Sequence, residues 1–162
     1  MSIRHARPGD HAAIAEVNAL AFGGADEVRL IERLRADGDV LFELVAVEDD
    51  RVIGHILFSR LYADRSELFA ALAPLAVRPG QQRGGTGSAL VRAALEQARE
   101  FGAHGVLVLG HPAYYPRFGF AAETAAQVAS PYRGNPAFMA LALEKDAFGA
   151  PLTVAYPDAF SG

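Results

Sequence analysis

Residues 78–90, which read RPGQQRGGTGSAL, place four glycines and two glutamines between an apolar run and a segment with a helical pattern. A glycine inside a helix or strand costs roughly 0.5–1 kcal/mol relative to alanine, so several together at one corner need a compensating role. In a buried strand, a glycine-rich turn and a helix start, unpaired backbone N–H groups and the positive end of the helix dipole point at an anion, usually a phosphate. The stretch therefore predicts a phosphate-binding loop.

The common nucleotide motifs do not fit this loop. Gly80 and Gly85 have the spacing of a Walker A motif, but Thr86 stands where that motif requires lysine. Gly85 and Gly87 supply two positions of a dinucleotide fingerprint, and Leu90 fills the third position, which should be glycine. A nucleotide-binding regulator therefore remains an alternative that rests on the glycines alone.

The segment before the loop is predicted to be helical first and then extended. Apolar residues recur at helical intervals in residues 10–22 and 26–38, with Asp10 as the expected N-cap and Gly38 as the expected terminator. Residues 41–61 hold two strand patterns joined by a short acidic turn. This order predicts two helices followed by an antiparallel pair of strands.

The loop is flanked by a buried strand and a helix. Residues 68–77 are almost wholly apolar, as expected of a strand buried on both faces, and Pro74 inside it predicts a bulge or an unpaired stretch. A helix ending at Gly102, a short strand at residues 105–110, a late strand at residues 137–144 and a weaker one at residues 152–157 follow. The order of elements predicts an α/β (α+β) fold, and we expect one domain over residues 1–162.

Two short motifs point to one family. Gln82–Gly87 reads Q-x-x-G-x-G after a strand and before a helix, which resembles the coenzyme A pyrophosphate loop of the GNAT superfamily of acyl-CoA-dependent N-acyltransferases. Tyr115–Phe120, with the sequence YPRFGF, resembles the tyrosine and Gly-Phe near the end of the superfamily's core. Further stretches, among them GHILFSRL, LAPLAV and FMALAL, extend the resemblance to the YhbS-like branch over nearly the full chain.

This resemblance implies a fold, a reaction and a set of coenzyme-binding residues. The fold would be a mixed central sheet with splayed middle strands, flanked by helices. The reaction would be direct transfer of an acetyl group from acetyl-CoA, as co-substrate, to a primary amine of a small molecule or peptide. The residues implied to bind the coenzyme, through the strand before the loop and the loop itself, are Leu75, Ala76, Val77, Gln82, Arg83, Gly84, Gly85, Thr86, Gly87 and Ser88. Arg78 and Arg83 are candidates for added positive charge at the phosphates.

The catalytic groups are only partly defined by the sequence. Tyr115 occupies the position of the superfamily's general acid, and a phenol suits proton donation to a departing thiolate. Three residues are candidates for the general base: Glu27, His55 and His111. Each also has a structural interpretation: Glu27 as a solvated acid in the first turn of a helix, His55 as a hydrogen-bonded core histidine, and His111 as a cap at the end of a strand. An amine that is already partly neutral needs no dedicated base.

Composition excludes several other classes of function. The chain lacks cysteine, so it has no thiolate metal site or cysteine nucleophile, and we expect no metal. Fifteen basic and nineteen acidic residues are dispersed, giving a formal charge of −4 and no nucleic-acid patch. No apolar run is long enough for a membrane span or signal peptide, so we expect a cytoplasmic protein; the resemblance also allows a homodimer. A non-catalytic acyl-CoA-binding or sensing module is the main alternative function.

Overall fold

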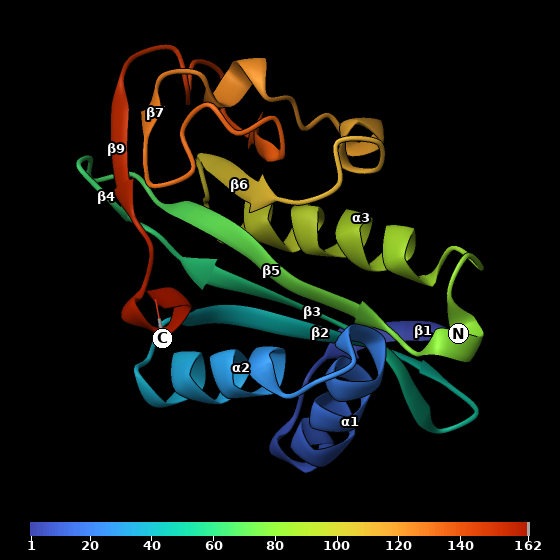
Figure 1. Cartoon of the computed structure of the whole chain (residues 1–162). Helices are drawn as coiled ribbons and strands as arrows, with labels where there is room; N and C mark the ends of the chain where they lie inside the picture. The colour runs from blue at the N-terminus through green and yellow to red at the C-terminus, as the bar shows by residue number, and fades with distance from the viewer. Residues whose placement is uncertain (162) are drawn as a thin grey trace. The chain divides into compact units, whose positions relative to one another are not determined.

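The structure is a computed structural model that describes residues 1–161 (Figure 1). The chain divides into two compact units. The first unit comprises Met1–Phe58 and Pro74–Leu95. The second comprises Ser59–Ala73 and the described residues from Glu96 onward. Strand β5 (Phe69–Val77) and helix α3 (Thr86–Glu100) each contribute residues to both units. The mixture of helices and strands confirms the predicted α/β class.

The first unit begins with the two predicted helices, α1 (His11–Phe22) and α2 (Asp26–Ala36), preceded by a short 3-10 turn, η1 (Pro8–Asp10). Their buried apolar residues are Ile14, Val17, Ile31 and Leu34. Asp10 precedes α1 as predicted, but its carboxylate does not cap the helix. It accepts hydrogen bonds from the Arg4 guanidinium at 2.7 and 3.0 Å and from the backbone N–H of Arg7 at 2.8 Å.

The strands of the first unit lie in the order β1, β2, β3, β5. The first three are β1 (Ser2–His5), β2 (Val40–Glu48) and β3 (Arg51–Arg60), and β1 pairs antiparallel with β2 so that Ile3 lies opposite Ala46. Asp49 and Asp50, with φ of 51° and 60°, form the predicted acidic turn. Left-handed backbone is tolerated by aspartate, which explains two acidic residues at this position.

The glycine-rich stretch connects β5 to α3 through a 3-10 turn, η2 (Pro79–Gln81). Leu90, Val91, Ala94 and Leu95 form the buried side of α3 within the first unit. On β3, a Cβ added to Gly54 would lie 2.9 Å from Leu90 Cδ1. Glycine at this position therefore allows α3 to pack closely against the sheet.

The second unit contains the first half of β5 and the remaining strands: β4 (Tyr62–Ala63), β6 (Gly105–Leu109), β7 (Val128–Ala129), β8 (Phe138–Ala142) and β9 (Leu152–Ala155). Its short 3-10 helices are η3 (Tyr115–Phe118), η4 (Glu123–Ala125) and η5 (Asp158–Ser161). β6 lies between β5, which is parallel to it, and β8, which is antiparallel. β4, β9 and β7 form a smaller sheet.

The ladder between β5 and β6 is short. Paired residues run from Phe69, opposite Gly105, to Leu72, opposite Val108. The ladder ends two residues before Pro74, which agrees with the predicted loss of pairing at a residue that has no N–H to donate. β5 is therefore one continuous strand, but only its first half pairs with β6.

Candidate functional site

The loop between β5 and α3 presents unpaired backbone donors. Arg83 and Gly85 have φ of 67° and 88°, so left-handed residues alternate along the chain just before α3 begins at Thr86. Within residues 1–161, the N–H groups of Gly84, Gly85 and Gly87 have no hydrogen-bond acceptor. Such a turn at a helix N-terminus concentrates partial positive charge, which favours an anion.

The loop is open to solvent beside these donors. Residues 81–85 are exposed, and no other atom lies within 4 Å of a Cβ added at Gly85. The loop is thus open on the side where a ligand would approach. Thr86, in contrast, is buried at 6% exposure and fixes the start of α3. The predicted phosphate-binding loop therefore has both the donors and the space that it needs.

Val77, at the end of β5, has main-chain groups on a free strand edge. The N–H of the next residue, Arg78, donates to the Ile53 carbonyl of β3 at 2.8 Å. Because main-chain groups of successive residues in a strand point to opposite edges, the N–H and C=O of Val77 face away from β3. The Gln82 side-chain amide donates to this C=O at 3.0 Å, which leaves the Val77 N–H available.

Arg78 does not supply charge to the loop, contrary to one sequence-based expectation. Its side chain is 7% exposed, and its Nε donates to the Val52 carbonyl at 2.8 Å. Its Nη1 donates to Glu16 on α1 at 2.7 Å. Arg78 therefore links β5, β3 and α1. Arg83 is exposed and is the arginine of the loop itself.

Tyr115, the predicted acid, lies in the second unit at the start of η3. Its side chain is only 7% exposed, and its ring packs edge-on against Tyr114 and Phe120 at centroid distances of 5.1 and 5.7 Å. Among the residues described, its hydroxyl has no hydrogen-bond partner. Burial, with a smaller effect from Tyr114, raises the pKa of Tyr115 to about 12. The phenol is therefore protonated at neutral pH and free to donate.

Gly110 creates the space for the Tyr115 ring. A Cβ added to Gly110 would lie 2.4 Å from Cε2 and 2.8 Å from Cδ2 of that ring. These separations are far below a van der Waals contact, so any larger residue at position 110 would displace the ring. Only the distance between position 110 and the Tyr115 ring, which the sequence does not give, shows why glycine is needed there.

Tyr114 contacts Tyr115 through its ring, whereas His111 contacts it through a backbone hydrogen bond. The Tyr114 ring is half-buried, with the Arg117 guanidinium 4.5 Å from its centroid. This packing agrees with its interpretation as a wall residue. His111 is exposed, and its carbonyl accepts the backbone N–H groups of Tyr114 and Tyr115 at 3.0 and 3.3 Å. The second unit thus brings His111 next to Tyr115 in one short turn.

His55, the second base candidate, is buried in the first unit with both ring nitrogens engaged. Asn18 Nδ2 donates to the Ile14 carbonyl and lies 3.1 Å from His55 Nδ1, which must therefore be an acceptor. His55 Nε2 then donates to Glu43 Oε1 at 2.9 Å. Burial lowers the pKa of His55, and the hydrogen bond to Glu43 does not offset this effect. The ring is a neutral core histidine.

Glu43 connects this histidine to α2. Both of its oxygens accept hydrogen bonds from Arg35, at 2.8 and 2.9 Å. Burial alone would raise the pKa of Glu43, but the hydrogen bonds from His55 and Arg35 outweigh it and lower the pKa to about 2. Glu27, the remaining base candidate, is half-buried in the first turn of α2, and its carboxylate has no hydrogen-bond partner within residues 1–161.

Comparison with known proteins places the chain in a family. Residues 12–120 match the acetyltransferase (GNAT) family. The chain belongs to that family. It is 40% identical over 116 residues to the uncharacterized N-acetyltransferase YjhQ of Escherichia coli K12, covering 68% of this chain and 64% of YjhQ, slightly less than two thirds of that protein. It is 37% identical over 122 residues to the uncharacterized N-acetyltransferase YhbS of the same strain, covering 74% and 73%.

Solved structures of this family match almost the whole chain. A crystal structure of E. coli YhbS in complex with CoA has a TM-score of 0.93 and 32% identity, covering 99% of this chain and 92% of YhbS. A GNAT acetyltransferase from Brucella melitensis in complex with acetyl-CoA has a TM-score of 0.82 and 36% identity, covering 98% and 97%. These neighbours confirm the resemblance to the GNAT superfamily and to its YhbS-like branch.

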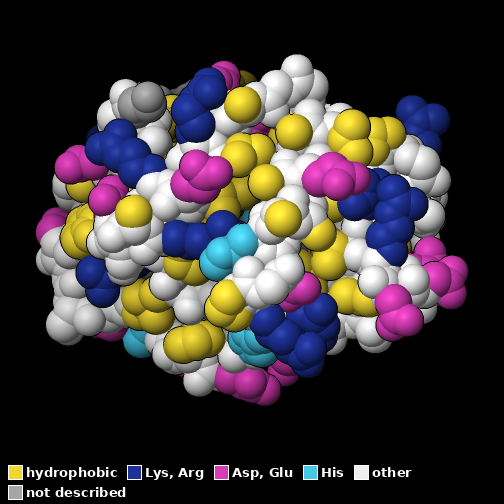
Figure 2. Space-filling model, turned by 90° about the horizontal axis from the view of Figure 1, so that it is seen from below, with side chains coloured by type: hydrophobic (Ala, Val, Ile, Leu, Met, Phe, Trp, Pro, Cys, Tyr) yellow, Lys and Arg dark blue, Asp and Glu magenta, His cyan; other side chains and the backbone are white. Residues whose placement is uncertain are grey.

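No group of three or more potential metal-ligating side chains occurs in the described chain, and no helix in it could cross a bilayer. On the face drawn in Figure 2, acidic and basic side chains are interspersed with hydrophobic ones. Nucleic-acid binding normally uses a concentrated basic surface, which this face does not have.

Proposed function

We propose that this GNAT family member is an acetyl-CoA-dependent N-acetyltransferase that acts on a primary amine of a small molecule or peptide. The open loop at the start of α3, with its free N–H groups at Gly84, Gly85 and Gly87, is the observation that carries the proposal. The neighbours with CoA and acetyl-CoA support the same choice of co-substrate. The loop N–H groups would hold the diphosphate, together with the positive end of the helix dipole.

Each remaining step has a candidate group in this chain. Bound acetyl-CoA would supply the thioester carbonyl that the amine attacks. The free N–H of Val77 suits the role of a donor that stabilises negative charge developing on that carbonyl oxygen. Tyr115 holds a proton on its phenol oxygen up to high pH and would donate it to the departing thiolate.

The general base is the least defined part of the proposal. His55 has no nitrogen free to accept a proton and is fully buried, so we assign it a structural role. Glu27 and His111 remain candidates, because both side chains can be reached from solvent: Glu27 is half-buried and His111 is exposed. Replacing each with glutamine and measuring kcat/KM against pH would separate them, since loss of the base removes the acidic limb of the profile.

The first experiment is calorimetric titration with acetyl-CoA, with ATP and NAD as parallel controls. We expect saturable binding of acetyl-CoA in the range of about 1 μM to 1 mM that is usual for enzyme substrates, and none with the controls. Binding of ATP or NAD without acetyl-CoA would contradict the proposal. A screen of primary amines for release of the CoA thiol would then test turnover.

A non-catalytic acyl-CoA sensor would share the loop and bind acetyl-CoA equally well. The buried, protonated Tyr115 favours the enzyme, because binding alone does not require a proton donor. Full retention of transfer activity in Tyr115→Phe, or absence of transfer to every amine tested, would favour the sensor instead.

A further inference from the structure

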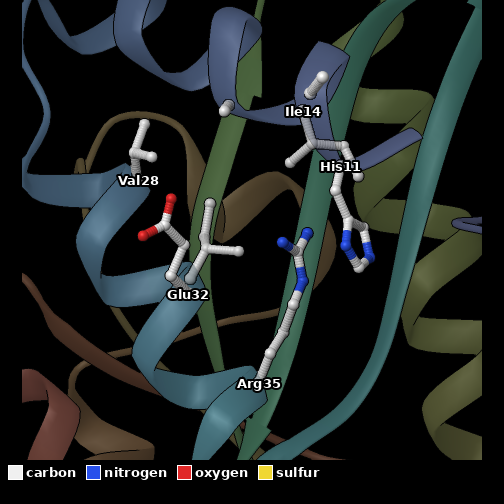
Figure 3. A pocket seen from close by; sticks show the side chains of 8 residues that line it. His11, Ile14, Val28, Glu32 and Arg35 are labelled. Carbon is white, nitrogen blue, oxygen red and sulfur yellow. The ribbon is translucent and has the colours of Figure 1, made fainter. Parts of the chain in front are cut away.

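A pocket of about 350 Å³ lies between α1 and α2 in the first unit, and no step of the proposed transfer uses it (Figure 3). Its volume lies within the range of about 300–1,000 Å³ typical of small-molecule sites. The residues that line it are His11, Ala12, Ile14, Ala15, Val28, Ile31, Glu32 and Arg35. The lining combines aliphatic side chains with charged groups of both signs.

Most of the residues that line the pocket are aliphatic. Ala15 and Val28 line the pocket and are half-buried, so part of their apolar surface is exposed, whereas Ile14 and Ile31 behind them are 0% and 2% exposed. His11, Ala12 and Glu32 are exposed, so the pocket is open to solvent on their side. A ligand with a small apolar body would gain free energy by covering the exposed apolar surface of Ala15 and Val28.

The guanidinium of Arg35 has one hydrogen-bond donor, Nη1, that is available to a ligand in the pocket. Its Nε and Nη2 hold the two oxygens of Glu43, which is itself held by His55. Arg35 Nη1 has no acceptor among residues 1–161. Figure 3 shows the guanidinium pointing from α2 into the pocket, toward the His11 side. Because the guanidinium is already fixed by Glu43, binding an acceptor at Nη1 costs little additional side-chain entropy.

Glu32 provides the opposite charge on the other side. It precedes Arg35 by three residues on α2, and its carboxylate has no partner within the described chain. In Figure 3 the carboxylate lies toward Val28, whereas the Arg35 guanidinium lies toward His11. The pocket thus has an acceptor at one side, a donor at the other and aliphatic side chains in between.

The charges of the side chains in and beside the pocket limit which ligands it can bind. Glu43 offsets the charge of Arg35, so the carboxylate of Glu32 is left without a compensating cation among the acidic and arginine side chains of the pocket. A phosphate or other polyanion would meet repulsion from Glu32. A simple amine would leave Arg35 Nη1 without an acceptor, and a simple carboxylate would leave Glu32 unpaired. A ligand that carries both an ammonium and a carboxylate satisfies both groups.

We propose that this pocket binds a small α-amino acid with an aliphatic side chain. The carboxylate accepts hydrogen bonds from Arg35 Nη1, the ammonium group donates to Glu32, and the side chain covers Ala15 and Val28. This proposal does not depend on transferase activity, because binding is measured without acetyl-CoA.

The test is calorimetric titration with L-leucine and with two truncated analogues, 3-methylbutylamine and 4-methylpentanoate. We expect saturable binding of leucine and binding about tenfold weaker, or more, for each analogue, since each loses one charge-assisted hydrogen bond. Two variants of exposed residues, Glu32→Gln and Ala12→Leu, should weaken leucine binding by a similar factor through lost charge and through filling of the pocket. Glu100→Gln, an exposed acid on α3, is the matched control and should bind leucine like the wild type.

Adding acetyl-CoA then separates two uses of the same ligand. Release of CoA thiol with formation of N-acetylleucine would identify the amino acid as acceptor, and binding without consumption would identify it as a regulatory ligand. Either result supports the site. Absence of saturable leucine binding, equal binding of the truncated analogues, or unchanged binding in both pocket variants would overturn it, whether or not the protein transfers acetyl groups.

Discussion

A single glycine, Gly110, determines where the proposed acid can lie. Tyr115 was predicted from its motif, because a tyrosine before Gly-Phe is a local sequence pattern. The need for glycine at position 110 could not be predicted, because it depends on the close approach of a ring five residues later along a turn. The same applies to Gln82, whose place in the loop motif gave no indication that its amide binds the Val77 carbonyl.

We predict that Gly110→Ala lowers kcat by displacing the Tyr115 ring. General acids contribute about 10²–10⁴-fold, so Tyr115→Phe should lower kcat by roughly 10²-fold or more, and Gly110→Ala by about tenfold or more. KM for acetyl-CoA should change little in either variant. The measurement is steady-state kinetics on the two single variants and the double variant.

The double variant distinguishes positioning of Tyr115 from a general loss of structure. If Gly110 acts through Tyr115, adding Gly110→Ala to Tyr115→Phe should cost no further activity. Independent, multiplying losses in the double variant would contradict this interpretation. Gly80→Ala is the control, because a Cβ at Gly80 meets no atom within 4 Å and the residue does not have positive φ.

His55 should make stability fall as the solution becomes acidic. Its pKa is lowered from 6.5 in the folded protein, so below about pH 6.5 the unfolded chain takes up a proton that the folded chain does not. The free energy of unfolding should therefore decrease between pH 7 and 5, by at most about 1.4 kcal/mol per pH unit for one proton. Urea unfolding at several pH values measures this slope.

His55→Gln removes the titrating group and should reduce that slope, even if the variant is less stable at every pH. His111→Gln, a change at an exposed histidine, should leave the slope as in the wild type. An unchanged slope in His55→Gln would show that other groups cause the acid sensitivity.

At the scale of elements, the segments with a clear apolar pattern were predictable, including the short strands β6, β8 and β9, whereas β1, β4 and β7 were not. α1, α2, α3 and the strands β2, β3 and β5 follow from apolar patterns that span two or more turns or pleats. β1, β4 and β7 contain two to four residues each and owe their structure to partner strands elsewhere in the chain. Leu20 and Phe101 fit the helical periods but are 52% and 48% exposed, because each lies at a helix end.

The turn before α3 allows an element-scale test of coenzyme binding. Gly85 has φ of 88°, which an alanine adopts only with strain, so Gly85→Ala should distort the row of N–H donors. We expect at least tenfold weaker binding of acetyl-CoA by calorimetry, with secondary structure unchanged by circular dichroism. Wild-type affinity in Gly85→Ala would show that the loop does not hold the diphosphate, and Gly80→Ala again provides the matched control.

At the scale of the whole molecule, β5 and α3 pass from one compact unit into the other, so neither unit is built from one continuous segment. Separate unfolding of one unit would require part of a strand and part of a helix to melt while the rest stays ordered. We therefore predict a single cooperative thermal transition. The expectation of one domain over residues 1–162 stays a prediction until this transition is measured.

Acetyl-CoA should move that single transition as a whole. At a ligand concentration of about 100 Kd the stabilisation is about 2.7 kcal/mol, which corresponds to a rise in Tm of roughly 5–11 °C for a chain of this size. Scanning calorimetry with increasing acetyl-CoA measures the shift. Two transitions, of which only one responds to acetyl-CoA, would show instead that the units unfold independently and that the ligand is held by the unit containing residues 82–88 alone.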